Sequence, residues 1–261
     1  MNVNQHILVH DGERPQRGPV QALSFIDSGQ QPASHEKQRR IGIWDLGAWL
    51  GNLSELIEGF NSVQPSLVFF EVLATVPSGM ISTPQRMIGW AEEKLDAKLK
   101  AGEKRELVNN LVFEDFTELA NVIRKDLKLD LIVGVTPSMI AGEEANGSIY
   151  WNFFSTFDKK CVLASSYDLR RYGKETGIPY EAFLGGIICA QTLVALFYPK
   201  FGFHDNTGCL FDFNEDRESI KDKAKDLKIE PACEKLIPKA YRAAAMSLVE
   251  YLRTYSRKPK R

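Results

Sequence analysis

The sequence has almost no net charge and no uninterrupted apolar run of the length that a membrane span needs. Its formal net charge is −1 over 261 residues, so no overall field favours nucleic acid or an anionic membrane surface. We interpret the basic stretch Ser256–Arg261 as a solvated tail. The longest apolar run, residues 183–198, is interrupted by Gln191 and Thr192, which favours a buried helix over a span of about 18 apolar residues. We therefore expect neither a membrane nor a nucleic acid as partner.

Cysteines are few, and a phosphate-binding loop is missing. The first ten residues are too polar for the apolar core of a secretion signal, so we expect a cytoplasmic protein with reduced thiols. Such thiols are packed, reactive or bound to a metal. No sequence of the form G-x4-G-K-[ST] occurs, and we expect no nucleotide cofactor. The four cysteines are Cys161, Cys189, Cys209 and Cys233.

Strand and helix patterns alternate through the first half of the chain. Residues 41–60 predict a short strand and then a helix, and residues 65–76 have the β-branched and aromatic content of a buried strand. Thr83 and Pro84 are typical of the first positions of a helix. Residues 129–136 are continuously apolar, as in a strand buried on both faces. The apolar face of the first helix is expected to comprise Trp49, Leu53, Leu56, Ile57 and Phe60.

The second half is expected to contain two more strands and then mostly helices. The strands are predicted over residues 147–157 and 159–169. Helices are predicted over residues 180–198, 214–227 and 231–255. This order favours an α/β (α+β) fold with a mixed, partly antiparallel sheet, flanking helices and a helical C-terminal cap.

We expect the whole chain, residues 1–261, to form a single domain, because no long low-complexity linker interrupts it. Within that domain the N-terminal α/β half covers residues 1–128. The middle region covers residues 129–236, and the C-terminal helix with its basic tail covers residues 237–261.

Two short pairs of metal-ligating residue types lie in the C-terminal third. His204 and Cys209 are spaced as H-x4-C, and Glu230 and Cys233 follow as E-x2-C after twenty intervening residues. Structural zinc sites are built in this way, because each pair supplies two ligands from one turn and the spacer lets the second pair fold back. The four residues therefore predict a structural zinc site. The alternative is that Cys209 is a small buried apolar residue and that His204 caps a turn with Asp205.

The same positions predict a cluster even without a metal. In that case hydrogen bonds and apolar packing would hold the four residues together. The packing is expected from Leu210, Phe211 and Phe213.

On these residues the chain resembles the archaemetzincin-type zinc peptidases. That family carries C-x4-C-x-M, a spacer of about 17 residues and then C-x2-C. His204, Cys209, Glu230 and Cys233 fall on its four cysteine positions. The similarity extends over residues 129–236, and it implies a metzincin-like core with a structural zinc ion.

The resemblance fails at the catalytic motif. Metzincins need HExxHxxGxxH on a helix, where two histidines hold zinc and the glutamate activates water. The corresponding helix, residues 180–198, has no histidine, and its one carboxylate is Glu181 at the start. It reads "ICAQT" where HExxH is expected, with Cys189 and Gln191 in place of imidazole and carboxylate. We therefore expect no catalytic metal.

Two other sites remain open as alternatives. Cys189 beside Gln191, with His204 as its base, would be a thiol nucleophile. Tyr167, Arg170 and Arg171 follow a predicted strand, where α/β proteins bind ligands, and paired arginines suit a carboxylate or phosphate. The plainer interpretations are a packed cysteine and a solvated connection.

The sequence thus favours a non-catalytic, peptidase-like protein that recognises a protein or peptide, or serves as a subunit of an assembly. A peptide would add to the edge strand near residues 147–157. One alternative is a zinc-dependent or thiol hydrolase with an unusual site that uses some of Cys189, Glu181, Tyr167 and Arg170. The other is a sensor of a small anionic ligand at Arg170 and Arg171.

Overall fold

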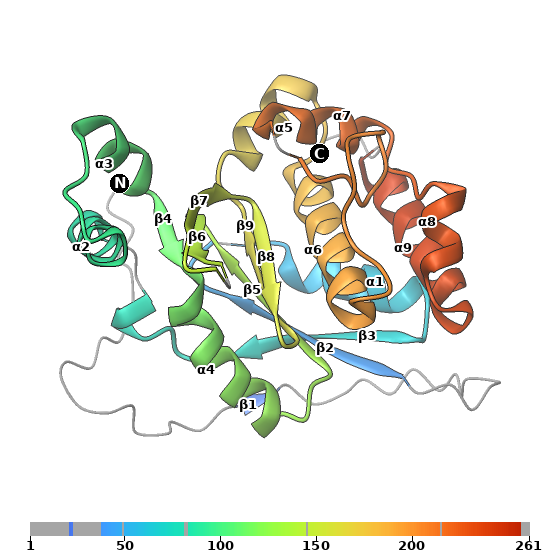
Figure 1. Cartoon of the computed structure of the whole chain (residues 1–261). Helices are drawn as coiled ribbons and strands as arrows, with labels where there is room; N and C mark the ends of the chain where they lie inside the picture. Colours follow the sequence, from blue (N-terminus) through green and yellow to red (C-terminus); the bar gives the residue numbers. More distant parts are fainter. Residues whose placement is uncertain are drawn as a thin grey trace, which may run out of the picture.

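The computed structural model describes residues 21–22, 38–48, 50–80, 83–144, 146–214 and 216–256. Trp49 and the basic residues 257–261, on which predictions were made above, lie outside the described residues. Figure 1 shows the chain with its helices and strands.

A six-stranded mixed sheet forms the centre of the molecule, in the order β1-β3-β2-β5-β9-β8. The four inner strands are parallel, and the two outer strands, β1 and β8, run antiparallel to their neighbours. The predicted mixed, partly antiparallel sheet is confirmed. The strands are β1 (Gln21–Ala22), β2 (Arg39–Asp45), β3 (Leu67–Leu73), β5 (Leu131–Thr136), β8 (Ser155–Asp158) and β9 (Cys161–Ser165).

The prediction that residues 129–136 form a strand buried on both faces is confirmed by β5, whose residues are all buried. Leu131, Val133 and Val135 pack into the core on one face, and Ile132 packs into the core on the other. This alternation follows from the two-residue period of a strand. A strand in the middle of such a sheet must be apolar throughout.

Helices cover both faces of the six-stranded sheet (Figure 1). On one face lie α1 (Leu53–Val63), α6 (Tyr180–Phe197) and α9 (Lys239–Ser256), which share one large apolar core. On the other face lies α4 (Phe113–Asp126), which packs into a second core. Leu53, Leu56, Ile57 and Phe60 of α1 are buried as predicted.

A smaller three-stranded sheet lies beside the main one, in the order β4-β6-β7. Its strands are β4 (Asn110–Val112), β6 (Met139–Glu143) and β7 (Ile149–Phe153). A separate apolar cluster joins it to α2 (Pro84–Leu95) and α3 (Ala101–Leu107). At the start of α2, the Thr83 hydroxyl accepts a hydrogen bond from the Arg86 N–H, so the predicted N-cap is confirmed.

The single strand predicted over residues 147–157 is wrong, because this segment forms two strands in two different sheets. β7 ends at Phe153 and β8 begins at Ser155, and Asn152, the residue before the end of β7, has a left-handed φ of +65°. The side chain of Asn110 accepts a hydrogen bond from the Asn152 N–H and donates one to its side-chain oxygen. These bonds stabilise a backbone conformation that interrupts a regular strand.

The C-terminal helix predicted over residues 231–255 is also divided. It consists of α8 (Pro231–Leu236) and α9, separated at Ile237 and Pro238. Pro238 cannot donate the hydrogen bond that a helix interior needs, and it restricts Ile237 to an extended backbone. The helix expected over residues 214–227 is shorter, with a 3-10 turn (Arg217–Ser219) followed by α7 (Ile220–Lys225).

The helix α6 confirms the prediction of a buried helix over residues 180–198. It is long and apolar enough to cross a membrane by length and composition alone, but 78% of it is buried inside the protein. Residues 182–195 are all buried. A helix that is apolar on every side is suited to a protein core.

Candidate metal centre

The loop that follows α6 carries the first predicted pair of ligands. The backbone N–H of His204 donates to the carbonyl of Phe211, and its own carbonyl accepts from Phe213 N–H, at 3.1 and 2.7 Å. The loop therefore folds back on itself, and His204 is held from both sides by main-chain hydrogen bonds. Its imidazole is partly exposed, with 31% of the side chain accessible to solvent.

Cys209 is fixed by the segment that leads into α8. Leu210 N–H donates to the carbonyl of Lys228 at 2.7 Å, and Cys209 forms a β-bridge with Lys228. Gly208 precedes it with a φ of +84°, a conformation that favours glycine. The thiol is fully buried, and the backbone N–H of Glu230 donates to its sulfur at 3.5 Å.

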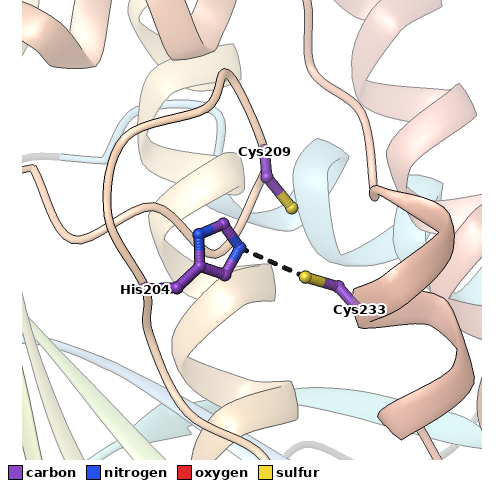
Figure 2. Close-up of side chains that lie close together, drawn as sticks. All are labelled: His204, Cys209 and Cys233. Atoms are coloured by element: carbon purple, nitrogen blue, oxygen red, sulfur yellow. Dashed lines mark hydrogen bonds between the residues drawn. The ribbon is translucent and has the colours of Figure 1, made fainter.

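Cys233 lies in the first turn of α8, which begins at Pro231. Proline suits this position because the first helical N–H groups have no partner within the helix. The helix brings the Cys233 thiol against the loop, where the ligand atoms of His204, Cys209 and Cys233 all lie within 4.8 Å of one another. Figure 2 shows the three side chains converging from the loop and from α8. The structure therefore brings together three of the four predicted ligands.

The hydrogen bonds of His204 determine which ring nitrogen faces the thiols. Nδ1 lies 2.7 Å from the carbonyl oxygen of Asp205, which can only accept, so Nδ1 carries the proton. In the neutral imidazole Nε2 is then the acceptor, and it lies 3.1 Å from the Cys233 sulfur. A histidine that donates from one nitrogen to a carbonyl and presents the other to a metal is the usual arrangement of a histidine ligand.

Asp212 organises this loop, and the sequence did not single it out. Its carboxylate is buried and accepts hydrogen bonds from the Thr207 N–H, the Gly208 N–H and the Thr207 hydroxyl, at 3.0, 2.7 and 3.1 Å. It also lies 3.5 Å from Nδ1 of His204. The carboxylate thus joins the turn before Cys209 to the histidine. In the sequence, the short separation of Asp212 from Thr207 and Gly208 is the only indication of this role.

We expect Asp212→Asn to destabilise the protein by about 1–3 kcal/mol, because an amide cannot replace both oxygens as acceptors of buried donors. If a metal is bound, its affinity should also fall by roughly 10–100-fold, as for other residues that orient ligands. Urea denaturation and a competitive chelator titration measure the two effects. Asp205→Asn is the matched control, because Asp205 is exposed and contacts His204 through its carbonyl. Equal effects of both variants would contradict this role for Asp212.

Burial favours a neutral Cys233 thiol as long as no cation is present. Burial, with Cys209 alongside, raises the pKa of Cys233 to about 12. A thiophilic cation would reverse this preference, because a coordinated thiol is deprotonated. On the other side of the loop, burial lowers the pKa of Lys223 to about 8. Its ammonium donates to the carbonyl of Asp212 and to the side chain of Asn214.

The donor set fits zinc. One imidazole nitrogen and two thiols are ligands that Zn²⁺ prefers, whereas Mg²⁺ and Ca²⁺ need oxygen. Two of the three side chains are buried and the third is partly exposed. The cluster could therefore hold a metal ion such as zinc, with His204, Cys209 and Cys233 as its protein ligands.

The fourth predicted ligand, Glu230, differs from the expectation. Among the described residues, its carboxylate is not part of the group of ligand atoms within 4.8 Å. Glu230 is the N-cap residue of α8, with an extended backbone, and it turns its N–H toward the Cys209 sulfur. In the pair E-x2-C, Cys233 therefore offers its side chain as a ligand, whereas Glu230 contributes a backbone hydrogen bond to Cys209.

The residues proposed as a thiol site do not lie in an open pocket. Cys189 and Gln191 are buried in α6. The Gln191 amide donates to the Ser155 hydroxyl at 2.6 Å. Burial raises the pKa of the Cys189 thiol, which opposes formation of a nucleophilic thiolate. His204, the expected base, faces Cys233 instead.

The remaining candidates contact different parts of the chain. Glu181 accepts a hydrogen bond from Asn52 at 3.3 Å. The Tyr167 hydroxyl lies 3.4 Å from the Asn109 amide, and the Arg170 guanidinium lies over the Tyr180 ring. The arginines belong to a helix, α5 (Leu169–Thr176), and not to a loop.

Comparisons with known proteins give a small number of structural matches. No protein-family model and no curated protein matches the sequence. The chain is similar to the crystal structure of an archaemetzincin from Methanopyrus kandleri, with a TM-score of 0.48, 12% identity, and coverage of 81% of this chain and 99% of that chain. It is also similar to a zinc-dependent peptidase from Methanocorpusculum labreanum, with a TM-score of 0.45, 14% identity, and coverage of 76% and 100%. Neither match assigns a function to this chain.

Proposed function

We propose that this protein binds a structural zinc ion at His204, Cys209 and Cys233 and acts by recognising an extended peptide of a partner protein, without hydrolysing it. The observation that supports the metal site is the convergence of the three ligand atoms within 4.8 Å. Two of these ligands come from a loop and the third from α8, so a bound metal would join two segments that are separate in the sequence. Such a metal contributes directly to folding.

The absence of hydrolysis is supported by the character of α6. Its residues 182–195 are buried, and they include no histidine and no carboxylate. A catalytic zinc of the HExxH type takes two histidine ligands and a glutamate general base from such a helix, and this part of α6 supplies none of them. The side chains of α6 instead fill the core that the helix shares with α1 and α9.

The proposed recognition surface is the edge formed by β7 and β8. Among the strands that the structure describes, each is the last of its sheet and pairs with one neighbour. Extended peptides bind such edges by strand addition, with aromatic side chains as anchors. Tyr150 and Phe153 have ring centroids 4.7 Å apart, and Phe213 packs edge-on against Phe153 at 6.0 Å. Phe213 is 47% exposed.

Phe213 also links this surface to the metal centre. Its backbone N–H donates to the carbonyl of His204 at 2.7 Å, while its ring contacts Phe153. A bound metal would therefore fix the position of one aromatic side chain of the recognition surface. This link supports a single function for the metal centre and the recognition surface.

The alternative of an anion sensor has less support, because Arg171 already contacts three carboxylates. Its guanidinium pairs with Asp168, Glu175 and Glu218 at 2.8–3.2 Å. An anionic ligand would have to compete with these groups. Arg170 lies over the Tyr180 ring.

Peptide binding is tested with a library of random peptides and the purified, zinc-loaded protein. We expect selected peptides to bind with an affinity that Phe213→Ala lowers by about tenfold, since exposed aromatic anchors contribute more than about 1 kcal/mol to such interfaces. Val122→Ala is the control, because Val122 is similarly exposed on α4 at the other face of the main sheet. Cleavage of casein or of the peptides by this protein, abolished by a chelator, would overturn the proposal.

A further inference from the structure

Cys209 and Cys233 form a close pair of thiols that do not belong to a disulfide. Both are free cysteines, and their sulfur atoms lie within 4.8 Å of each other. A disulfide requires the two sulfur atoms to approach to about 2 Å, so the side chains would have to rotate toward each other. The unprotonated Nε2 of His204 lies 3.1 Å from the Cys233 sulfur, and the Glu230 N–H lies against the Cys209 sulfur. The pair therefore has a proton acceptor on one side and a hydrogen-bond donor on the other.

We propose that Cys209 and Cys233 are a site of oxidative modification, at which a peroxide converts the metal-free thiol pair into a disulfide. This inference rests on the proposed metal site, because the same two sulfur atoms would bind the metal. Coordinated sulfur is not available for a disulfide, so metal binding and the disulfide exclude each other. Oxidation would then release the metal and reduction would restore its site.

The reaction balances with one peroxide. Cys233 attacks a peroxide oxygen, so that an S–O bond forms, the O–O bond breaks and water leaves. The thiol proton of Cys233 passes through His204 to the departing oxygen. Cys209 then attacks the sulfenic sulfur, so that the S–S bond forms, the S–O bond breaks and a second water leaves. Two thiols are oxidised by two electrons, and the peroxide is reduced to two waters.

Cys233 is the better first reactant, because it lies beside the partly exposed His204, whereas Cys209 is fully buried. Cys233 is itself buried, with 5% of the residue exposed, so peroxide has limited access to its sulfur. We therefore expect a slow reaction that needs excess peroxide.

The other two cysteines provide internal controls. Cys161 lies in the core on the α4 face of the main sheet, and Cys189 lies in α6 on the opposite face. The sheet separates them, so they cannot pair with each other. Both are buried, and neither belongs to the cluster of His204, Cys209 and Cys233. We expect both to stay reduced under conditions that join Cys209 to Cys233.

The test exposes metal-free and zinc-loaded full-length protein to hydrogen peroxide, followed by peptide mapping by mass spectrometry without reduction. We expect a cross-linked pair of peptides containing Cys209 and Cys233 in the metal-free protein only, with loss of two hydrogen atoms. Cys209→Ser should stop the reaction at oxidised Cys233, and Cys161→Ser should leave the cross-link unchanged. Because the wild-type map is decisive, a variant that fails to fold does not affect the test.

The outcomes separate this inference from the metal proposal. Zinc binding without a cross-link in the metal-free protein would overturn the inference and leave the metal site intact. A cross-link in a protein that binds no zinc under any loading condition would support the thiol pair and refute the metal site. A cross-link that forms equally with zinc bound would overturn the mutual exclusion.

Discussion

Cys209→Ser is expected to abolish zinc binding and to lower the free energy of unfolding by several kcal/mol in the zinc-loaded protein. The variant removes one of the three ligands that the described part of the chain brings together. Binding of a structural metal is also folding free energy, because the unfolded chain has no preformed site. Elemental analysis measures the loss of metal, and urea denaturation with and without zinc measures the loss of stability.

Cys189→Ser is the matched control for this experiment. Cys189 is also a buried cysteine in the same core, but it lies in α6 and is not part of the cluster. Burying a hydroxyl there lowers stability by about 1–3 kcal/mol, with or without zinc. We expect this variant to retain its full metal content. If zinc stabilises Cys209→Ser as much as it stabilises the wild-type protein, Cys209 is not a ligand.

Phe211→Ala is expected to lower the free energy of unfolding by about 3–5 kcal/mol, in the metal-free and the zinc-loaded protein alike. Phe211 lies in the loop that carries His204 and Cys209, and its fully buried ring packs edge-on against Phe201 at a centroid distance of 4.3 Å. Removing the ring leaves a cavity that the surrounding core fills only in part. Thermal or urea denaturation measures the change.

Phe213→Ala provides the comparison within the same loop. Phe213 is 47% exposed, so its truncation should lower stability by less than about 1 kcal/mol. The sequence predicts that Leu210, Phe211 and Phe213 hold the cluster by apolar packing. Leu210 and Phe211 are buried as that role requires, whereas Phe213 packs outward against Phe153. A loss of stability that is equal for Phe211→Ala and Phe213→Ala would contradict this division.

Several elements were predicted correctly because residues close together in the sequence determine them. The continuous apolar residues of β5 follow from burial on both faces, and the all-apolar α6 follows from its position in the core. The H-x4-C spacing identified two members of the metal-ligating cluster, because the turn between His204 and Cys209 is short. The side chain of Thr83 caps α2 without help from distant residues.

The structure differs from the predictions where contacts between residues distant in the sequence determine the local conformation. The strand predicted over residues 147–157 is divided between two sheets, and near the end of β7 the left-handed backbone of Asn152 is held by Asn110 from another strand. Glu230 has a suitable residue type and spacing, but its position at the start of α8 turns its backbone toward Cys209. Asp212 was missed because its three hydrogen bonds become visible only when the loop is folded. The break in the C-terminal helix at Pro238 could have been predicted from the sequence, since proline rarely lies inside a helix.

The metal content of the purified protein tests the central claim most directly. The protein is isolated under reducing conditions, loaded with zinc and freed of excess metal, and analysed by elemental mass spectrometry beside Cys209→Ser and Cys189→Ser. We predict one zinc ion per chain in the wild-type protein and in Cys189→Ser, and none in Cys209→Ser. A wild-type protein that retains no zinc, or a Cys209→Ser variant that retains as much as the wild type, would contradict the account.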